Sequence, residues 1–205
     1  MNFKPVRTGK SVVAISALAI IASVTFAGCA ATTADITTKV DEQSQANNPK
    51  NNATNPKIQE QYVVMFAQMM IPHHQQAVDM GKLAETRASS AAVKELAAKI
   101  AGEQAPEVTM MQGWIDAAGT GADMNMGHMP MGGMLTEAQM AELKAASGAT
   151  FDKLYLTDMI AHHQGAVKMA KLVIKANTAK LMKLAKSIVK SQTAEIDYMK
   201  SLLAK

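Results

Sequence analysis

The motif Met69-Met-Ile-Pro-His-His-Gln-Gln-Ala-Val-Asp-Met80 recurs as Asp158-Met-Ile-Ala-His-His-Gln-Gly-Ala-Val-Lys-Met169, displaced by 89 residues. Four of the chain's five histidines lie in these two copies, and methionines flank each pair at the spacing of one helix face. The repeat therefore predicts two related helices in a duplicated fold. Because neutral imidazole and thioether groups bind soft and borderline metals, copper above all, the same residues are candidate metal ligands.

The sequence around the motif, from Ile58 onward, is typical of an all-α protein. Strong helix formers dominate it, and no alternation of β-branched and aromatic residues is long enough to predict a strand. Stripes with a helical period occur in four segments. The first two stripes are Val63, Phe66, Met70, His73, Ala77, Met80 and Ala84, then Val93, Leu96, Ile100, Gln104, Glu107, Met111 and Trp114. The last two are Tyr155, Met159, His162, Ala166, Met169 and Val173, then Leu181, Leu184, Ile188, Gln192, Glu195, Met199 and Leu202.

The stripes of the two halves align position by position, with an offset of 89 in the histidine helices and 88 in their partners. Two related helical hairpins, packed as a four-helix bundle, are therefore predicted. Ser89 and Ser90 are expected to cap the second helix, and Thr136 with Gln139 to form the capping box of a short extra helix. Pro72 is expected to kink the first helix.

Each hairpin is expected to bring His, Met, Gln and Glu side chains to one height in the interior. Counting from the turns, the level pairs are His73 with Gln104, Met70 with Glu107, His162 with Gln192, and Met159 with Glu195. His74 and His163 point about 100° away from their neighbours, toward the edge of the stripe. We therefore expect two half-buried, methionine-flanked sites; the spacing leaves open whether the pairs converge on one site. The alternative is a structural Glu–His pair in each half, with methionine as packing.

Mixed histidine and methionine ligands favour copper, as Cu(I) or Cu(II). The chain has no Glu-x-x-His and no His-Glu-x-x-His sequence, which argues against a di-iron enzyme and a zinc protease. The candidate ligands in the two hairpins are Met69, Met70, His73, His74, Met80, Met159, His162, His163 and Met169. The residues expected to orient the imidazoles are Gln104, Glu107, Gln192 and Glu195.

An insert between the hairpins, residues 119–135, adds a second group of candidate Cu(I) ligands. Its Gly and Pro content predicts a loop, and thioethers are costly in a solvated loop that binds nothing. Its candidate ligands are Met124, Met126, His128, Met129, Met131 and Met134. The alternatives are a low-complexity linker and a hydrophobic lid.

The N-terminal residues resemble a bacterial lipoprotein signal. Residues 1–28 combine a basic start, an apolar stretch and small residues before Cys29, the only cysteine, which would be lipidated. The alternatives are a secretory signal cleaved nearby and an uncleaved anchor. Residues 29–57 are rich in Asn, Gln, Thr and Ala and predict a flexible tether, so that 58–205 form the folded domain. A lipidated Cys29 would leave no thiolate for a disulfide or a zinc cluster.

The net charge of +4 is an effect of the signal segment. Without Lys4, Arg7 and Lys10, 18 basic residues remain against 17 acidic ones. This balance does not indicate a nucleic-acid partner.

The repeated motifs carry a family likeness. Phe66, Met70-Ile-Pro-His-His-Gln-Gln-Ala77 and Met80, followed by Gln104, Glu107, Met111 and Trp114, resemble the bacterial family known as domain of unknown function 305 (DUF305). The second copy, with Asp158-Met-Ile and His162-His-Gln-Gly-Ala166, resembles it as well, so the likeness covers about Ile58 to Leu203. It implies a ferritin-like four-helix fold, and some members of the family are periplasmic copper binders. The chain departs from its own repeat at Met69, where the second copy has Asp158, and at Pro106, where it has Ala194.

Together these features predict a lipid-anchored copper-binding protein of the bacterial cell envelope that sequesters or relays copper without catalysis. The expected location is the periplasmic face, on the outer membrane if the host is Gram-negative. The expected partners are the copper ion, a copper export or chaperone protein, and the membrane through the lipid anchor. The alternatives are an envelope interaction module with buried His–Glu pairs, and a metal-dependent redox enzyme, for which the sequence offers no catalytic motif.

Overall fold

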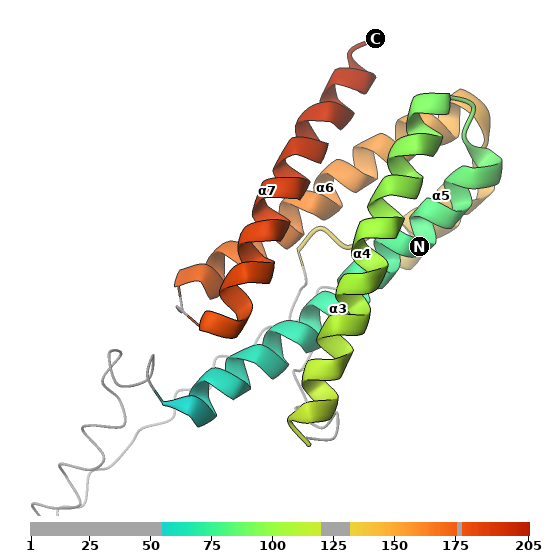
Figure 1. The fold of residues 1–205 in the computed structure, drawn as a ribbon. Coiled ribbons are helices and arrows are strands. Elements are labelled where there is room, and N and C mark those ends of the chain that lie inside the picture. Colours follow the sequence, from blue (N-terminus) through green and yellow to red (C-terminus); the bar gives the residue numbers. More distant parts are fainter. Residues whose placement is uncertain (1–54, 120–131, 176–177) are drawn as a thin grey trace, which may run out of the picture. The chain divides into compact units, whose positions relative to one another are not determined.

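The computed structural model describes residues 55–119, 132–175 and 178–205, and these ranges contain helices and no strand. The helices are α3 (Pro56–Arg87), α4 (Ala91–Ala117), α5 (Glu137–Ala145), α6 (Gly148–Lys175) and α7 (Ala179–Leu203), shown in Figure 1. The all-α prediction is confirmed. The predicted signal, the lipidation site Cys29, nearly all of the tether and the insert ligands Met124, Met126, His128, Met129 and Met131 lie outside the described residues.

Local sequence signals explain most of the helix ends. α3 begins at Pro56, two residues before the predicted domain start, because Asn55 accepts a hydrogen bond from the Lys57 amide and proline suits the first helical turn. Ser90 caps α4, as predicted. The predicted capping box of Thr136 and Gln139 opens α5, with both of its hydrogen bonds present.

Neither Pro72 nor Pro106 ends its helix. α3 runs on through Pro72 and α4 through Pro106, so the first hairpin keeps two long helices. Within the described residues, no helix is long and apolar enough to span a membrane.

The duplicated hairpins predicted from the repeat are present. α3 packs along α4, α6 packs along α7, and the two hairpins meet through α3 and α6 (Figure 1). The four long helices thus form a bundle whose inner pair carries the two His-His motifs. The short α5 packs against α6.

The core of this bundle is divided into two apolar clusters. The turn-side cluster contains Phe66 and Met70 of α3 together with residues near the α6–α7 turn, such as Leu181. The α5-side cluster contains Met80 and Ile100 together with residues of α5 and the start of α6. Along each long helix, polar residues separate the two clusters, so a buried polar layer crosses the middle of the bundle.

Candidate metal centre

The polar layer consists of four histidines, two glutamines and two glutamates, with equal contributions from the two repeats. Its members are His73, His74, Gln104, Glu107, His162, His163, Gln192 and Glu195. All four histidine side chains are fully buried, at 0% exposure. Since burying a polar group without a partner is unfavourable, eight such residues in one layer need a structural or functional reason.

The two hairpins contact each other through the first histidine of each motif. The rings of His73 and His162 lie 3.8 Å apart between centroids, at an interplanar angle of 40°. Burial, with a smaller contribution from His74, lowers the pKa of His73 to about 3. Burial and the nearby His73 hold the pKa of His162 well below its usual value. Both rings are therefore neutral at physiological pH and keep a lone pair that could bind a metal.

The second histidine of each motif is hydrogen-bonded to a glutamate of its own hairpin. His74 Nε2 lies 2.9 Å from Glu107 Oε2, and His163 Nε2 lies 2.9 Å from Glu195 Oε2. A carboxylate only accepts, so Nε2–H donates in each pair and Nδ1 keeps the lone pair. Carboxylate–imidazole pairs of this kind orient metal-binding histidines in many proteins.

This arrangement corrects two of the expectations from the sequence. His74 and His163 were expected at the edge of their stripes, in half-buried sites, but they are as buried as His73 and His162. The reason is that α3 and α6 each pack against two neighbours, which widens the buried face beyond a single stripe. The contact between His73 and His162 also replaces two separate sites with one continuous layer.

The register across each hairpin differs from the counted one by about one helical turn. Glu107 was expected level with Met70, but its carboxylate bonds to His74, four residues further along α3. Glu195 was expected level with Met159 and bonds to His163 in the same way. The equal shift in both halves preserves the symmetry of the layer.

Several polar atoms of the layer have no hydrogen-bond partner. Nδ1 of all four histidines is buried without one, and so is Nε2 of His162. The side-chain Nε2 and Oε1 of Gln104 and the Oε1 of Gln192 are also buried without a hydrogen-bond partner. Each orphan atom costs roughly 1–3 kcal/mol unless something pairs with it. Each neutral imidazole keeps one lone pair, which fits a soft or borderline metal ion.

The side chains as they stand do not enclose an ion. Within the described ranges, no group of three or more His, Cys, Asp or Glu side chains is arranged to hold a metal. The donor types fit copper, since neutral imidazoles are available, but binding in the layer would require ring rotation or movement of the hairpins.

The candidate methionines lie mostly in the apolar clusters. Met70 and Met159 are fully buried at the ends of the two clusters, next to the polar layer in sequence. Met80 is buried within the α5-side cluster, seven residues or about 10 Å along the helix from His73. Met169 packs against the turn-side cluster and is half-buried. Met69 and Met134 are also half-buried.

A short segment after the insert, which we call the glycine strap (Gly132–Leu135), lies against the layer. The Gly132 carbonyl accepts a long hydrogen bond, 3.4 Å, from Nε2 of His73. The side chain of Gln76 holds the other end of the strap: its Oε1 accepts from the Leu135 amide at 2.7 Å, and its Nε2 donates to the Leu135 carbonyl at 3.0 Å. The strap thus fixes the proton of His73 on Nε2 and leaves Nδ1 free.

The strap fits because α6 has a glycine where it crosses. A Cβ on Gly165 would overlap the carbonyl oxygen of Gly132. Gly133, at φ +92°, lies so close to α6 that its own Cβ would come within 3.0 Å of the His162 carbonyl. Gln76 and Gly165 occupy equivalent positions of the two motifs. This departure from the repeat was the sequence signal for the strap, and sequence reasoning missed it.

Lys99 makes the two His–Glu pairs unequal, because it contacts only one of the two glutamates. Lys99 was not identified from the sequence as part of the site. Its ammonium group lies 2.6 Å from Glu195 Oε1 and 2.9 Å from Glu103 Oε1. Although burial opposes it, the hydrogen bonds from His163 and Lys99 hold the pKa of Glu195 below its usual value. With the offset of 88, Ser187 replaces Lys99 in the other repeat. Glu107 therefore has no lysine in the equivalent position.

A pocket between α4 and α7 connects the layer with the solvent. It has a volume of about 310 Å³ and is lined by Gln104 and Glu107 from α4 and by Gln192 and Glu195 from α7, among others. Glu107 is 20% exposed there, whereas Glu195 is 6% exposed. The carboxylates of both Glu107 and Glu195 therefore line a pocket that a cation can enter.

Comparison with known proteins confirms the family resemblance. A family model described as a domain of unknown function (DUF305) matches residues 64–203. The chain is similar to the structure of a candidate secreted DUF305 protein from Streptomyces coelicolor, with 39% identity and a TM-score of 0.62, covering 68% of this chain and 90% of that one. For a DUF305 fragment from Deinococcus radiodurans, the identity is 31%, the TM-score 0.63 and the coverage 70% and 95%.

A third similar structure is that of CopM in the Cu(I)-bound form. It is 32% identical, with a TM-score of 0.57, and the match covers 68% of this chain and 94% of CopM. CopM has also been solved in Cu(II)-bound and Ag-bound forms. Among proteins with curated descriptions, none matches this chain.

Proposed function

This chain belongs to the DUF305 family, and from that premise we propose that it binds copper in the polar layer between its two hairpins. One observation carries the proposal: the Nδ1 atoms of four buried histidines lie in one layer without any hydrogen-bond partner. Neutral imidazole nitrogens are good ligands for copper in either oxidation state. The Cu(I)-, Cu(II)- and Ag-bound forms of CopM support the choice of a soft metal.

The layer's residues divide into two roles in this proposal. His73 and His162 would bind the ion from the contact between the hairpins, and His74 and His163 from the sides. Glu107 and Glu195 would hold the flanking rings through Nε2–H, which directs their Nδ1 lone pairs inward. Met70 and Met159 are the nearest thioethers in sequence and would favour Cu(I), and Met69 would assist them.

The wider biological role is proposed from the same features. We propose an extracytoplasmic, lipid-anchored protein that sequesters or relays copper without catalysis, attached through Cys29. Met80, Met169 and the insert ligands around His128 remain predictions; the insert would capture Cu(I) and pass it inward. An envelope protein that exports or carries copper is the expected partner.

A Cu(I) titration against a chromogenic chelator under reducing conditions tests the proposal. The wild-type protein is expected to compete with the chelator, and a variant with His73, His74, His162 and His163 all changed to Ala is expected to lose most of that competition. A Gln164→Ala variant is the control, because Gln164 is exposed and lies outside the polar layer. If the four-histidine variant binds as tightly as the wild type, copper does not bind in the layer.

Changing the orienting carboxylates should weaken copper binding without abolishing it. Glu195→Gln and Glu107→Gln keep the shape of each side chain but remove its charge, so each is expected to lower copper affinity by about 10- to 100-fold. The same titration measures this change. Glu103→Gln is the matched control, since Glu103 contacts Lys99 and no histidine in the described structure. An unchanged affinity in both variants would show that the His–Glu pairs only stabilise the fold.

A second function, a purely structural layer, is favoured by one observation. The His–Glu bonds already satisfy Nε2 of His74 and His163, and apolar clusters enclose the layer on both sides. The titration separates the two functions, because a structural layer predicts no copper binding by the folded wild-type protein.

A further inference from the structure

The second hairpin carries a long stretch without negative charge. No Asp or Glu occurs between Asp158 and Glu195, whereas seven lysines do. All seven are exposed, and none forms an ion pair with a carboxylate of the described residues. They are Lys168, Lys171, Lys175, Lys180, Lys183, Lys186 and Lys190, and we call them the lysine end.

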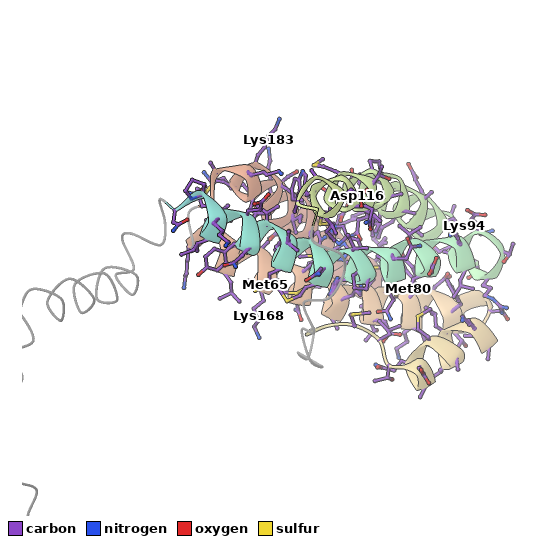
Figure 2. The ribbon with its side chains drawn as sticks, turned by 90° about the horizontal axis from the view of Figure 1, so that it is seen from below. Met65, Met80, Lys94, Asp116, Lys168 and Lys183 are labelled. Carbon is purple, nitrogen blue, oxygen red and sulfur yellow. The ribbon has the colours of Figure 1, made fainter. Side chains whose placement is uncertain are left out.

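The lysine end surrounds one end of the bundle. Its members occupy the last turns of α6 and the first turns of α7, on either side of the α6–α7 turn. Lys175 and Lys180 are nearest the turn, followed by Lys171 and Lys183. Lys168 lies about 10 Å behind Lys175 along the helix. Figure 2 shows Lys168 and Lys183 projecting from opposite sides of this end, with Lys94 at the far end of the bundle.

The tether enters the domain at the same end. Pro56 and Lys57, at the start of α3, line a pocket together with Thr178 and Lys180 at the start of α7. Glu60 lines that pocket as well, and Asp116 lies near the end of α4, so this end also holds some negative charge. The seven lysines and Lys57 outnumber these carboxylates.

The near-neutral charge of the mature chain therefore hides a segregation of charge. Residues 55–119 carry five basic side chains against seven acidic ones. Residues 148–205 carry ten lysines against four acidic side chains. The positive excess is concentrated around the α6–α7 turn, since the acidic residues of that hairpin lie outside the stretch from 159 to 194.

We propose that the lysine end rests on an anionic lipid surface, the headgroups of the membrane that holds the anchor. A lysine close to such a surface contributes about 1 kcal/mol, and the attraction decays over a Debye length of about 8 Å at physiological ionic strength. The lysines nearest the turn would therefore contribute most. Side chains that surround one end of a bundle suit a flat surface approached end-on. The inference assumes the lipid anchor of the proposed function but does not require copper binding.

Lysine footprinting on reconstituted protein tests this proposal. The metal-free, lipidated full chain is placed in phosphatidylglycerol vesicles or in phosphatidylcholine vesicles and acetylated with an amine-reactive ester. Mass spectrometry then measures the labelling rate of each lysine. We expect Lys175, Lys180 and Lys183 to be labelled at least about threefold more slowly on the anionic vesicles, with the difference lost in high salt. Lys82 and Lys94, remote from the lysine end, should be labelled equally on both.

Two variants, each lacking four lysine charges, distinguish the lysine end from the rest of the surface. Changing Lys171, Lys175, Lys180 and Lys183 to Gln should abolish the protection of Lys57, which lines a pocket with Lys180 at the same end. Changing Lys82, Lys94, Lys153 and Lys200 to Gln removes the same charge elsewhere and should preserve it. Equal labelling on both kinds of vesicle would overturn the proposal. Protection by dissolved inorganic phosphate alone, or only by native envelope proteins, would also overturn it, in favour of a free anion or an acidic protein.

Discussion

Replacing Gly165 by alanine is expected to detach the glycine strap from α6 and to destabilise the protein by about 2–3 kcal/mol. The new Cβ would overlap the backbone oxygen of Gly132, and a backbone atom cannot move aside as a flexible side chain can. Displacement of the strap would break both Gln76–Leu135 hydrogen bonds and the contact between His73 and Gly132. Thermal unfolding measures the loss, and faster hydrogen exchange at the Leu135 amide reports that the strap has detached.

Gly113→Ala is the matched control for this substitution. Gly113 is an exposed glycine within α4, and a Cβ there would meet nothing within 4 Å. Alanine at this position should stabilise the helix by about 0.5–1 kcal/mol, a change of opposite sign. Gln76→Ala removes the side chain of α3 that holds Leu135 by two hydrogen bonds. It should therefore also accelerate hydrogen exchange at the Leu135 amide. Protected exchange at Leu135 in both the Gly165 and the Gln76 variants would contradict this account of the strap.

Lowering the pH of the metal-free protein from about 7 to about 5 should cost substantial stability through the buried histidines. In the unfolded chain, the imidazole of His73 has its ordinary pKa of 6.5, whereas burial lowers this pKa to about 3 in the folded state. The unfolded state therefore holds more protons below pH 6.5, so the contribution of His73 is complete above that pH and declines as the pH falls. For His73 alone, the loss between pH 7 and pH 5 is about 2 kcal/mol.

His162 and His163 should also make the folded state less stable as the pH falls. Burial lowers the pKa of both, with further lowering of His162 by His73, while the hydrogen bond from His163 to Glu195 partly opposes the effect. Urea unfolding of chelator-treated protein at several pH values measures the slope. His73→Gln should flatten this slope by up to about 1.4 kcal/mol per pH unit, because it removes one group that binds a proton in the unfolded chain but not in the folded one. A wild-type stability that does not change between pH 7 and pH 5 would contradict the neutral, buried state of these rings.

The sequence was sufficient to predict the helices and their duplication. Stripes such as Phe66 to Met80 and Tyr155 to Met169 depend on the helical period alone, and caps such as Thr136 and Ser90 act on their own backbone within a few residues. The family resemblance came from the same local patterns, and the match over residues 64–203 confirms it.

The candidate site was predictable only in part. The four histidines, two glutamines and two glutamates were identified. His74 and His163, however, were placed at the half-buried edge of a stripe, because a stripe describes one packing face and α3 and α6 have two. Lys99 reaches Glu195 across a sequence separation of 96 residues, and no local pattern marks such a contact. The strap could have been suspected, since Gln76 and Gly165 are the positions where the repeated motifs differ most in size.

The sequence by itself determined the direction in which each side chain leaves its own helix, because the helical period fixes that direction about the helix axis. Only the tertiary structure decided that the two inward-facing histidine pairs form one layer, with the rings of His73 and His162 3.8 Å apart. The approach of α3 and α6 depends on the packing of both apolar clusters across the hairpins and on Gly165, which admits the strap beside them. Such contacts join residues far apart in the chain, so their geometry follows from the fit of whole helices rather than from any local pattern.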